Sequence, residues 1–312
     1  MPTESTYGNV SYVSVGYDEL VTPVETVELH GHTVGYSVNP GQGTPLLLVH
    51  GVGSNMHTWG ALSHALVAAG QPYVAVDLLG HGSSGPGNGD FSLGANAARL
   101  RDLLDHLGID SAHLVGHSLG GGISMQFLYQ FPERTASLTL ISSGGLGTEV
   151  SMGLRAAALP GAKTVMQVIT APLVVRILRN ATGALESMGM HNADFDSHTV
   201  AKFERLQAPD RLDSFLATVR SVVGPAGQRV SAVELVSAVT DPTAVLIIWG
   251  ENDPMVPSDH GVDAHALLPG SSLVMIPGTG HHPHVDAVQV VATALLSHVA
   301  AHPARGAVLA DA

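Results

Sequence analysis

A serine between two glycines is the first group in this chain of 312 residues whose setting could support covalent chemistry. Gly116, Ser118 and Gly120 form the pattern Gly-x-Ser-x-Gly between an apolar, strand-like segment at 111–115 and a helix-like segment at 123–131. This arrangement is typical of a nucleophile elbow, where a serine sits on a strained turn. Side chains at positions 116 and 120 would collide across that turn, so glycine is expected at both. The pattern alone is common in a chain with 36 glycines, and partner residues must decide its meaning.

A serine hydroxyl is a weak nucleophile at neutral pH, so it needs a general base that a third group orients. Two later strand-like segments, at 244–249 and 271–276, each lead into a polar loop. The candidate partners in these loops are Glu251, Asp253, His281 and His282. Parallel strands end at one edge of a sheet, so we expect both loops to lie beside Ser118. The chain order serine, carboxylate, histidine is also the order expected for a triad on such a sheet.

The elements that would position these residues follow an alternating pattern. Segments 10–15 and 33–38 read as strands by their alternation of apolar and polar residues. Further strands are predicted at 45–49, 73–76 and 138–141, and helices at 58–69, 93–107, 258–268 and 285–299. Short apolar strands that alternate with helices indicate a doubly wound, mostly parallel sheet with helices on both faces. Gly121 and Gly122 would let the helix after Ser118 pack closely on that sheet.

The alternation stops between residues 144 and 241. This region contains helical stretches such as 163–179 but no predicted strand, and prolines divide it into segments. A helical insertion whose two ends meet the carboxyl edge of the sheet is expected to act as a cap, or lid, over a site there. We therefore expect a core in two parts, 1–143 and 242–312, with the cap at 144–241. Helices packed as ordinary core are the alternative.

Composition excludes several classes of function. The chain has 13 basic and 26 acidic residues, a net charge of −13, which argues against nucleic acid and anionic membrane surfaces as partners. It has no cysteine, which excludes disulfides, thiol nucleophiles and thiolate metal sites. Residues 1–12 lack the basic and apolar regions of a signal peptide, and no apolar stretch is long enough for stable membrane insertion. We expect a soluble cytoplasmic protein.

Taken together, these motifs resemble the α/β-hydrolase superfamily, and within it the helical-capped serine hydrolases related to esterases and cofactor-free haloperoxidases. The resemblance extends over nearly the whole chain outside the cap and the first residues. It rests on His50-Gly51 with the loop to Trp59, the segment 77–84, the serine motif, the segment 249–257 and the segment 278–283. It implies an α/β-hydrolase fold with an inserted helical cap.

The resemblance also implies a role for each candidate. Ser118 is the nucleophile, His281 the general base and Asp253 the group that orients His281. The family pattern selects His281 over His282 because proline stands two residues after the base, and it selects Asp253 over Glu251 because the carboxylate immediately precedes proline. The oxyanion hole would use the backbone N–H groups of Val52 and Leu119.

Other polar residues are expected to be structural. Asp77, His81 and Ser84 would support the loop beside the oxyanion hole, and His50 would order the turn before Val52. Two histidine groups could suggest a metal: His281, His282 and His284, and His30 with His32. The triad explains the first group, and no carboxylate pair completes either, so neither a metal nor a cofactor is predicted. The segment 191–198 is expected to be solvated.

The implied activity is a serine hydrolase that cleaves carboxylic esters, or lactones or thioesters, through an acyl-enzyme. Apolar residues in the cap suggest an apolar ester substrate and leave a homo-oligomer open. Related haloalkane dehalogenases and epoxide hydrolases carry aspartate where this chain has Ser118. Carbon–carbon bond hydrolases of ring-cleavage products usually have asparagine and tryptophan where this chain has His117 and His282. These hydrolases remain an alternative, as does a ligand-binding or receptor protein with little turnover on the same fold.

Overall fold

The structure, a computed structural model, describes residues 3–7, 10–14, 20–87, 89–188, 197–239 and 244–303. Its centre is a sheet of eight strands in the order β12-β11-β8-β7-β5-β6-β4-β3. The strands are β3 (Glu25–Leu29), β4 (His32–Asn39), β5 (Leu46–Val49), β6 (Tyr73–Val76), β7 (Ala112–His117), β8 (Thr135–Ile141), β11 (Ala244–Gly250) and β12 (Ser272–Ile276). All pairs from β6 to β12 are parallel, whereas β4 runs opposite to β6 and β3. The predicted doubly wound, mostly parallel sheet is confirmed.

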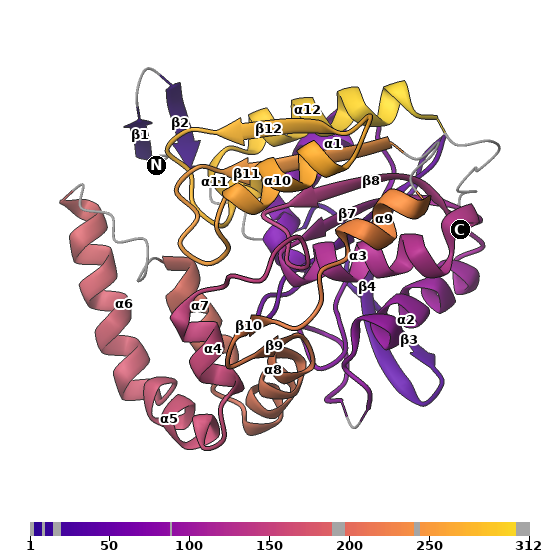
Figure 1. Ribbon diagram of the computed structural model, residues 1–312. Coiled ribbons are helices and arrows are strands. Elements are labelled where there is room, and N and C mark those ends of the chain that lie inside the picture. The colour runs from indigo at the N-terminus through magenta and orange to yellow at the C-terminus, as the bar shows by residue number, and fades with distance from the viewer. Residues whose placement is uncertain are drawn as a thin grey trace.

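Helices cover both faces of this sheet, as predicted (Figure 1). They are α1 (Gly60–Ala68), α2 (Leu93–His106), α3 (Leu119–Gln130), α10 (Asp259–Leu267), α11 (Pro283–Asp286) and α12 (Val288–Ala301). The strands divide their side chains between the faces with period two. Leu46 and Leu48 pack with α1 and α12, while Leu47 and Val49 pack with α2 and α3. Because both faces are covered, the central strands are mostly apolar, although β7 and β8 also bury His113, Ser137 and Thr139.

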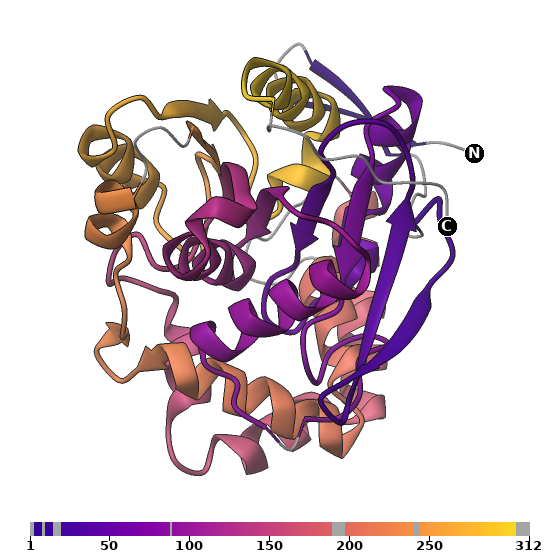
Figure 2. The same ribbon diagram turned by 90° about the vertical axis from the view of Figure 1, so that its right-hand side faces the viewer.

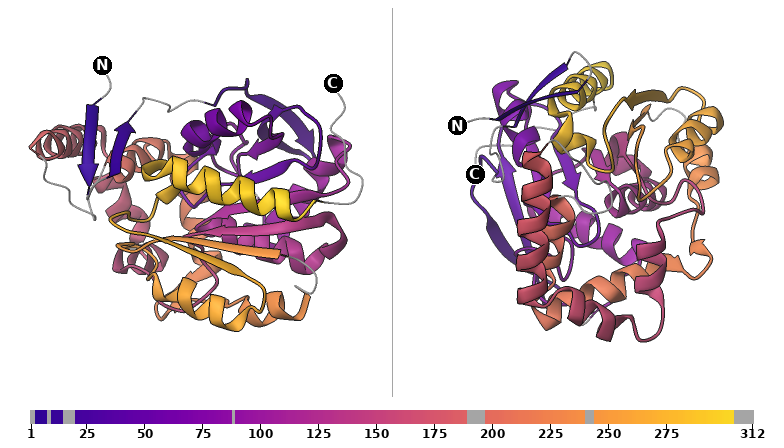
Figure 3. Two further views of the ribbon diagram at one scale, coloured as in Figure 1. Left: turned by 90° about the horizontal axis from the view of Figure 1, so that it is seen from above. Right: turned by 90° about the vertical axis from the view of Figure 1, so that its left-hand side faces the viewer.

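The region between β8 and β11 is helical, and we call its described residues, 144–188 and 197–239, the insertion. Its helices are α4 (Met152–Ala158), α5 (Ala162–Ile169), α6 (Pro172–Ser187), α7 (Ser197–Arg205), α8 (Pro209–Val222) and α9 (Val233–Val239). α4 to α8 lie beside the carboxyl ends of the parallel strands, and α6 lies at the periphery (Figures 1 and 3). Residues of α4, α5 and α8 form a separate small core centred on Phe215. α9 instead packs against α3 and contributes Val233 and Val236 to the sheet core.

Several details of the insertion differ from the sequence-based expectation. Two short strands, β9 (Val223–Gly224) and β10 (Gly227–Gln228), pair there although no strand was predicted. The predicted helix at 163–179 is two helices, because α5 ends at Ile169 and Pro172 starts α6. Within the described residues, no single helix is long and apolar enough to span a bilayer. The bent pair Ala162–Ile169 and Pro172–Leu185, at 59° to each other, meets those criteria only when both are taken together.

Outside the insertion the elements also differ from the prediction. The helix predicted at 285–299 is two helices, α11 and α12, which meet at Ala287. The helix after Ser118 begins at Leu119, four residues earlier than predicted. β3 was not predicted because only Val27 and Leu29 are partly buried in this outer strand. The segment predicted as a strand at 10–15 is β2 (Val10–Ser14), but it pairs with β1 (Thr3–Tyr7) in a separate sheet. Figure 2 shows the main sheet between its two helical layers, with the insertion to one side.

Candidate active site

Ser118 lies in the turn between β7 and α3, in a conformation that few residues adopt. Its φ of 54° and ψ of −117° fall outside the usual regions for a residue with a side chain. Hydrogen bonds fix this conformation: Ser118 N donates to Ile141 O at 3.0 Å, and Ser118 O accepts from Gly121 N and Gly144 N. Strain that the surrounding structure stabilises in this way is typical of functional positions. The predicted elbow geometry is therefore present.

The glycines around Ser118 are required by close approach. A Cβ at position 116 would lie 2.3 Å from Gly120 O, and one at position 120 would lie 2.1 Å from Val49 O. A Cβ at 121 would lie 2.0 Å from Ser143 Oγ, which confirms the predicted close packing of α3. Gly122 differs from this expectation, because a Cβ there would meet nothing nearer than 3.6 Å. Gly122 instead lines the pocket beside Ser118.

His281 and Asp253 come together from two loops. His281 Nδ1 lies 2.7 Å from Asp253 Oδ2, and both side chains are almost completely buried. Asp253 Oδ1 accepts from the backbone N–H groups of Met255 and Val256, which fixes the carboxylate. A carboxylate can only accept, so His281 Nδ1 donates to Asp253, and Nε2 is the ring nitrogen that can act as the base. The two rivals do not take this place: Glu251 is exposed, and the His282 ring lies at 83° to the His281 ring.

The two loops reach this arrangement because they bind each other. Glu251 N donates to Ile276 O and Asn252 N donates to Thr279 O. Gly250, the last residue of β11, permits the approach, because a Cβ there would lie 2.1 Å from Gly280 O. His117 adds a third contact, since its Nε2 donates to His281 O at 2.8 Å. The residue before Ser118 therefore positions the backbone of His281.

Val52 and Leu119, whose backbone N–H groups are the predicted oxyanion donors, line the same pocket as Ser118. Leu119 is the first residue of α3, where an N–H group has no acceptor within the helix. Across the described ranges, neither N–H group has a hydrogen-bond partner. A Cβ at Gly51 would lie 3.0 Å from the Ser118 Cβ, so glycine lets the 50–55 loop reach the serine turn. This arrangement can stabilise an anion that forms beside Ser118.

Two neutral histidines support the 50–55 loop. His50 Nδ1 donates to Gly51 O and its Nε2 accepts from Leu78 N. His81 Nδ1 donates to Leu79 O and its Nε2 accepts from Gly53 N at 3.1 Å. Burial lowers the pKa of His81 to about 4 and that of His50 well below its usual value, so both rings are neutral at pH 7 and can accept. Their expected structural roles agree with these contacts.

Asp77 and Ser84 complete this support. Asp77 Oδ1 accepts from Met56 N at 2.7 Å and Oδ2 from Ser83 N at 2.6 Å, which ties the 50–55 loop to the 77–85 loop. Ser84 Oγ donates to Asp77 O and accepts from Gly35 N. Burial is the main cause that raises the pKa of Asp77 to about 6, against the lowering effect of these backbone donors. Both residues therefore contact backbone groups, as expected for structural residues.

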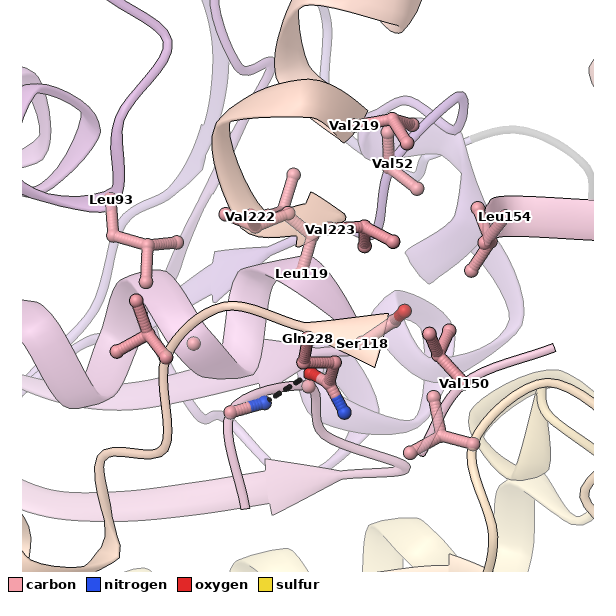
Figure 4. Close-up of a pocket in the computed structure, with 15 residues that line it drawn as sticks. Val52, Leu93, Ser118, Leu119, Val150, Leu154, Val219, Val222, Val223 and Gln228 are labelled. Atoms are coloured by element: carbon pink, nitrogen blue, oxygen red, sulfur yellow. Dashed lines mark hydrogen bonds between the residues drawn. The ribbon is translucent and has the colours of Figure 1, made fainter. Parts of the chain in front are cut away.

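The pocket beside Ser118 is apolar and is lined by both the core and the insertion (Figure 4). Its empty volume is about 560 Å³, part of it open to solvent. Leu93, Leu119 and Val256 belong to the core, while Leu154, Val219 and Val223 belong to the insertion. Gln228 is the one amide among the described lining residues. Its Oε1 accepts from Gly145 N at 2.7 Å and its Nε2 donates to Glu149 O, so these contacts engage both ends of the amide.

The sequence did not point to two contacts between the insertion and the site. Arg205, at the end of α7, donates from Nε to Gly53 O at 3.2 Å. His198, in the first turn of α7, stacks on His282 with ring centroids 4.7 Å apart. The segment 191–198 was expected to be solvated; 191–196 lie outside the described residues, and His198 contradicts that expectation because it packs on the 277–283 loop. No local sequence signal identifies these contacts, since they depend on how α7 packs.

The other histidine groups show no metal geometry. No group of three or more histidine, aspartate and glutamate side chains is arranged to bind a metal ion within the ranges that the structure describes. His284 Nε2 shares a hydrogen bond with Thr58 Oγ1 at 2.9 Å, and its ring lies 4.3 Å from the His117 ring. His30 Nε2 lies 3.1 Å from Asp102 Oδ2. These contacts are those of structural side chains.

Comparisons with known proteins agree with this geometry. Residues 46–294 match the model of the alpha/beta hydrolase family. An uncharacterized protein of Mycobacterium tuberculosis is 37% identical over 260 residues, which cover 83% of this chain and 75% of that protein. The 2-hydroxy-6-oxo-6-phenylhexa-2,4-dienoate hydrolase of Burkholderia cepacia is 28% identical over 245 residues, which cover 77% of this chain and 82% of the relative.

Solved structures show the same fold at low sequence identity. A meta-cleavage product hydrolase from Pseudomonas fluorescens superposes with a TM-score of 0.69 at 20% identity, covering 89% of this chain and 97% of that one. An esterase from Thermogutta terrifontis superposes with a TM-score of 0.66 at 20% identity, covering 90% and 98%. With the eight-stranded sheet and the strained serine turn, the family match shows that this chain is a member of the alpha/beta hydrolase family.

Proposed function

We propose that this protein is a serine hydrolase that cleaves carboxylic esters with an apolar acyl group, through an acyl-enzyme on Ser118. The observation that carries the proposal is the shared pocket. The strained Ser118 lines one cavity with Val52 and Leu119, whose N–H groups have no partner among the described residues, and His281 Nδ1 lies 2.7 Å from Asp253 Oδ2. Nucleophile, oxyanion donors and base are the groups that acyl transfer requires.

The proposed reaction has two halves. In acylation, His281 Nε2 removes the Ser118 Oγ proton as Oγ attacks the ester carbonyl, and the N–H groups of Val52 and Leu119 stabilise the oxyanion. The intermediate collapses when His281 returns this proton to the alkoxide, which leaves as an alcohol. In deacylation, His281 takes a proton from water, whose oxygen attacks the acyl carbon, and Ser118 Oγ recovers the proton as the acid is released. Asp253 stabilises charged His281 in both halves.

The pocket supports an apolar acyl group. Its described lining contains valine, leucine and glycine residues but no charged side chain. Four elements of the insertion contribute lining residues: α4, α8, β9 and β10. We therefore also propose that the insertion acts as a cap that determines how long an acyl chain can bind.

A carbon–carbon bond hydrolase is the second candidate, favoured by the relative in Burkholderia cepacia and the meta-cleavage product hydrolase structure. The substrate in the relative's name is a dienoate, which carries a carboxylate. A buried carboxylate needs a positively charged or strongly donating partner. No such side chain occurs among the described residues of the pocket, so the ester proposal is the better supported one.

The test combines turnover with covalent labelling. We expect steady hydrolysis of p-nitrophenyl esters in a series from acetate to octanoate, and loss of that hydrolysis in Ser118→Ala. A fluorophosphonate probe should label Ser118, as mapped by peptide mass spectrometry. Labelling of any other residue would refute the nucleophile assignment. Turnover of 2-hydroxy-6-oxo-6-phenylhexa-2,4-dienoate with no ester turnover would replace the proposal by its alternative, and single-turnover acylation alone would favour the ligand-binding protein.

A further inference from the structure

Helix α7 of the insertion spans the two loops that carry the proposed base and the proposed oxyanion donor. At its first turn, the His198 ring stacks on His282, the residue after His281, at an interplanar angle of 26°. His198 Nε2 also lies 3.5 Å from Asp286 Oδ1. At its last residue, Arg205 Nε donates to Gly53 O at 3.2 Å. One helix of nine residues therefore touches both sides of the site.

Gly53 connects helix α7 to the proposed oxyanion donor, the N–H group of Val52. It follows Val52 directly, and both of its backbone polar groups are engaged: N–H donates to His81 and the carbonyl accepts from Arg205. Its φ is +71°, and a Cβ there would lie 3.0 Å from the Lys202 side chain of α7 and 3.2 Å from Phe215. The loop beside Val52 therefore lies between a core histidine and the insertion, with little room to shift.

Arg205, like Arg155 and Arg211, bonds to a backbone carbonyl rather than to a carboxylate. It is partly buried, and no carboxylate of the described residues lies within ion-pair distance of it, whereas Arg101, Arg134 and Arg179 each have one. Removing a cation from water without an acidic partner is unfavourable, and burial accordingly lowers the pKa of Arg205. Gly53 O is the partner that Arg205 has instead. A charge-assisted bond to a carbonyl is stronger than a neutral one, so it can fix a loop.

We propose that Arg205 is a positioning residue. When α7 is packed on the core, Arg205 fixes the 50–55 loop in the position that points the Val52 N–H at the oxyanion; when α7 moves away, this orientation is lost. The catalytic consequence of this inference rests on the proposed function. The contact between Arg205 and Gly53 is independent of that function. It makes the insertion part of the catalytic assembly as well as a wall of the pocket. Displacement of α7 would remove one contact from each of two loops: the Arg205 bond to Gly53 O and the His198 stack on His282.

The test compares Arg205→Met with Arg205→Lys and with a matched control, Arg211→Met. Arg211, on α8, also donates from the insertion to a core carbonyl, Ser84 O at 2.8 Å, but that carbonyl belongs to the 77–85 loop. Arg205→Met should lower kcat on short esters by about 10-fold to 100-fold, somewhat less than the loss of an oxyanion donor, with KM nearly unchanged. Arg205→Lys keeps a cationic donor and should recover most of that loss. Arg211→Met should keep kcat within about twofold.

Hydrogen exchange provides a readout that needs no substrate. In Arg205→Met, exchange of a peptide covering residues 50–56 should accelerate about tenfold, with residues 77–85 little changed. Arg211→Met should show the reverse. Equal kcat losses in Arg205→Met and Arg211→Met, or unchanged exchange at 50–56 in Arg205→Met, would overturn the proposal. If wild type neither turns over esters nor labels at Ser118, the proposed function fails, while the exchange pattern still decides whether Arg205 fixes the loop.

Discussion

Acid should unfold this protein sharply between about pH 6.5 and pH 4, because its fold depends on buried neutral histidines. Burial lowers the pKa of His81 to about 4 and that of His284 to about 3. It lowers the pKa of His50 and His117 well below the usual value of 6.5. In this window the unfolded chain binds protons that the folded chain does not. The free energy of unfolding therefore falls as pH falls. The contribution of the neutral histidines has its full value only above about pH 6.5.

The size of the effect follows from these shifts. Burial also lowers the pKa of His113 and His298 to about 4. Between about pH 7 and pH 5, His81, His113, His284 and His298 each lower the free energy of unfolding by roughly 2 kcal/mol, or roughly 8 kcal/mol together. His50, His117 and His282 act in the same direction. Asp77 opposes this, because its pKa of about 6 lies above the unfolded value of 3.8, so the folded state gains protons first. That gain is roughly 1.4 kcal/mol at pH 5. The net loss is comparable to the whole stability of a typical domain, about 5–15 kcal/mol.

The assay is urea unfolding, followed by circular dichroism, at several pH values across this window. Averaged between about pH 7 and pH 5, the slope of the free energy of unfolding against pH should be at least about 3 kcal/mol per unit, which is about 1 per histidine less the opposing contribution of Asp77. His284→Gln removes one titrating ring and should lower that slope by about 1 kcal/mol per unit. His106, exposed on α2, is the matched control, and His106→Gln should leave the slope unchanged. A wild-type slope under about 2, or equal slopes in both variants, would refute the reasoning.

Two further predictions concern the site. Asp253→Asn keeps an oxygen for the backbone donors but loses the charge that orients His281, so kcat on esters should fall about 10⁴-fold while the protein stays folded. Gly122→Ala adds a methyl group to the pocket where nothing lies within 3.6 Å, so it should fold normally and lower kcat/KM about tenfold for the longest accepted acyl chain only. Gly121→Ala is its control, because its methyl group meets Ser143 at 2.0 Å; urea unfolding should show a loss of about 1–3 kcal/mol.

The parts of the site that could be predicted are those that local chemistry specifies. Gly116 is required by a clash within the turn, because a Cβ there would lie 2.3 Å from Gly120 O. Glycine was predicted at 120 too, although the atom that a Cβ there would meet is Val49 O of β5, at 2.1 Å. The loops with Asp253 and His281 follow apolar strands, and parallel strands place such loops at one edge. The positions of these residues relative to the predicted strands were sufficient to predict their place in the site. The two loops lie beside each other as expected, with their side chains 2.7 Å apart.

The misses arise where distant packing overrides local preference. Leu119 to Gly122 is a poor helix sequence because glycine disfavours helices, so the start of α3 was placed too late. The helix forms there nonetheless, because small residues permit its close contact with Ser143 and the β5 carbonyls. Arg205 and His198 were missed for a related reason. Their partners are 152 and 84 positions away along the chain, and only the packed position of α7 brings them together.

The ordered loops of the site and the acid sensitivity of the protein both depend on the same buried, neutral histidines. A neutral imidazole carries one donor and one acceptor, so a buried ring can bind a carbonyl and an N–H group at once. His50 and His81 do this for the 50–55 loop, and His117 donates to His281 O. A protonated ring could no longer accept from Leu78 N or Gly53 N. The contacts that place the oxyanion donor therefore exist only in the neutral form, and losing them should disorder the 50–55 loop as the protein unfolds in acid.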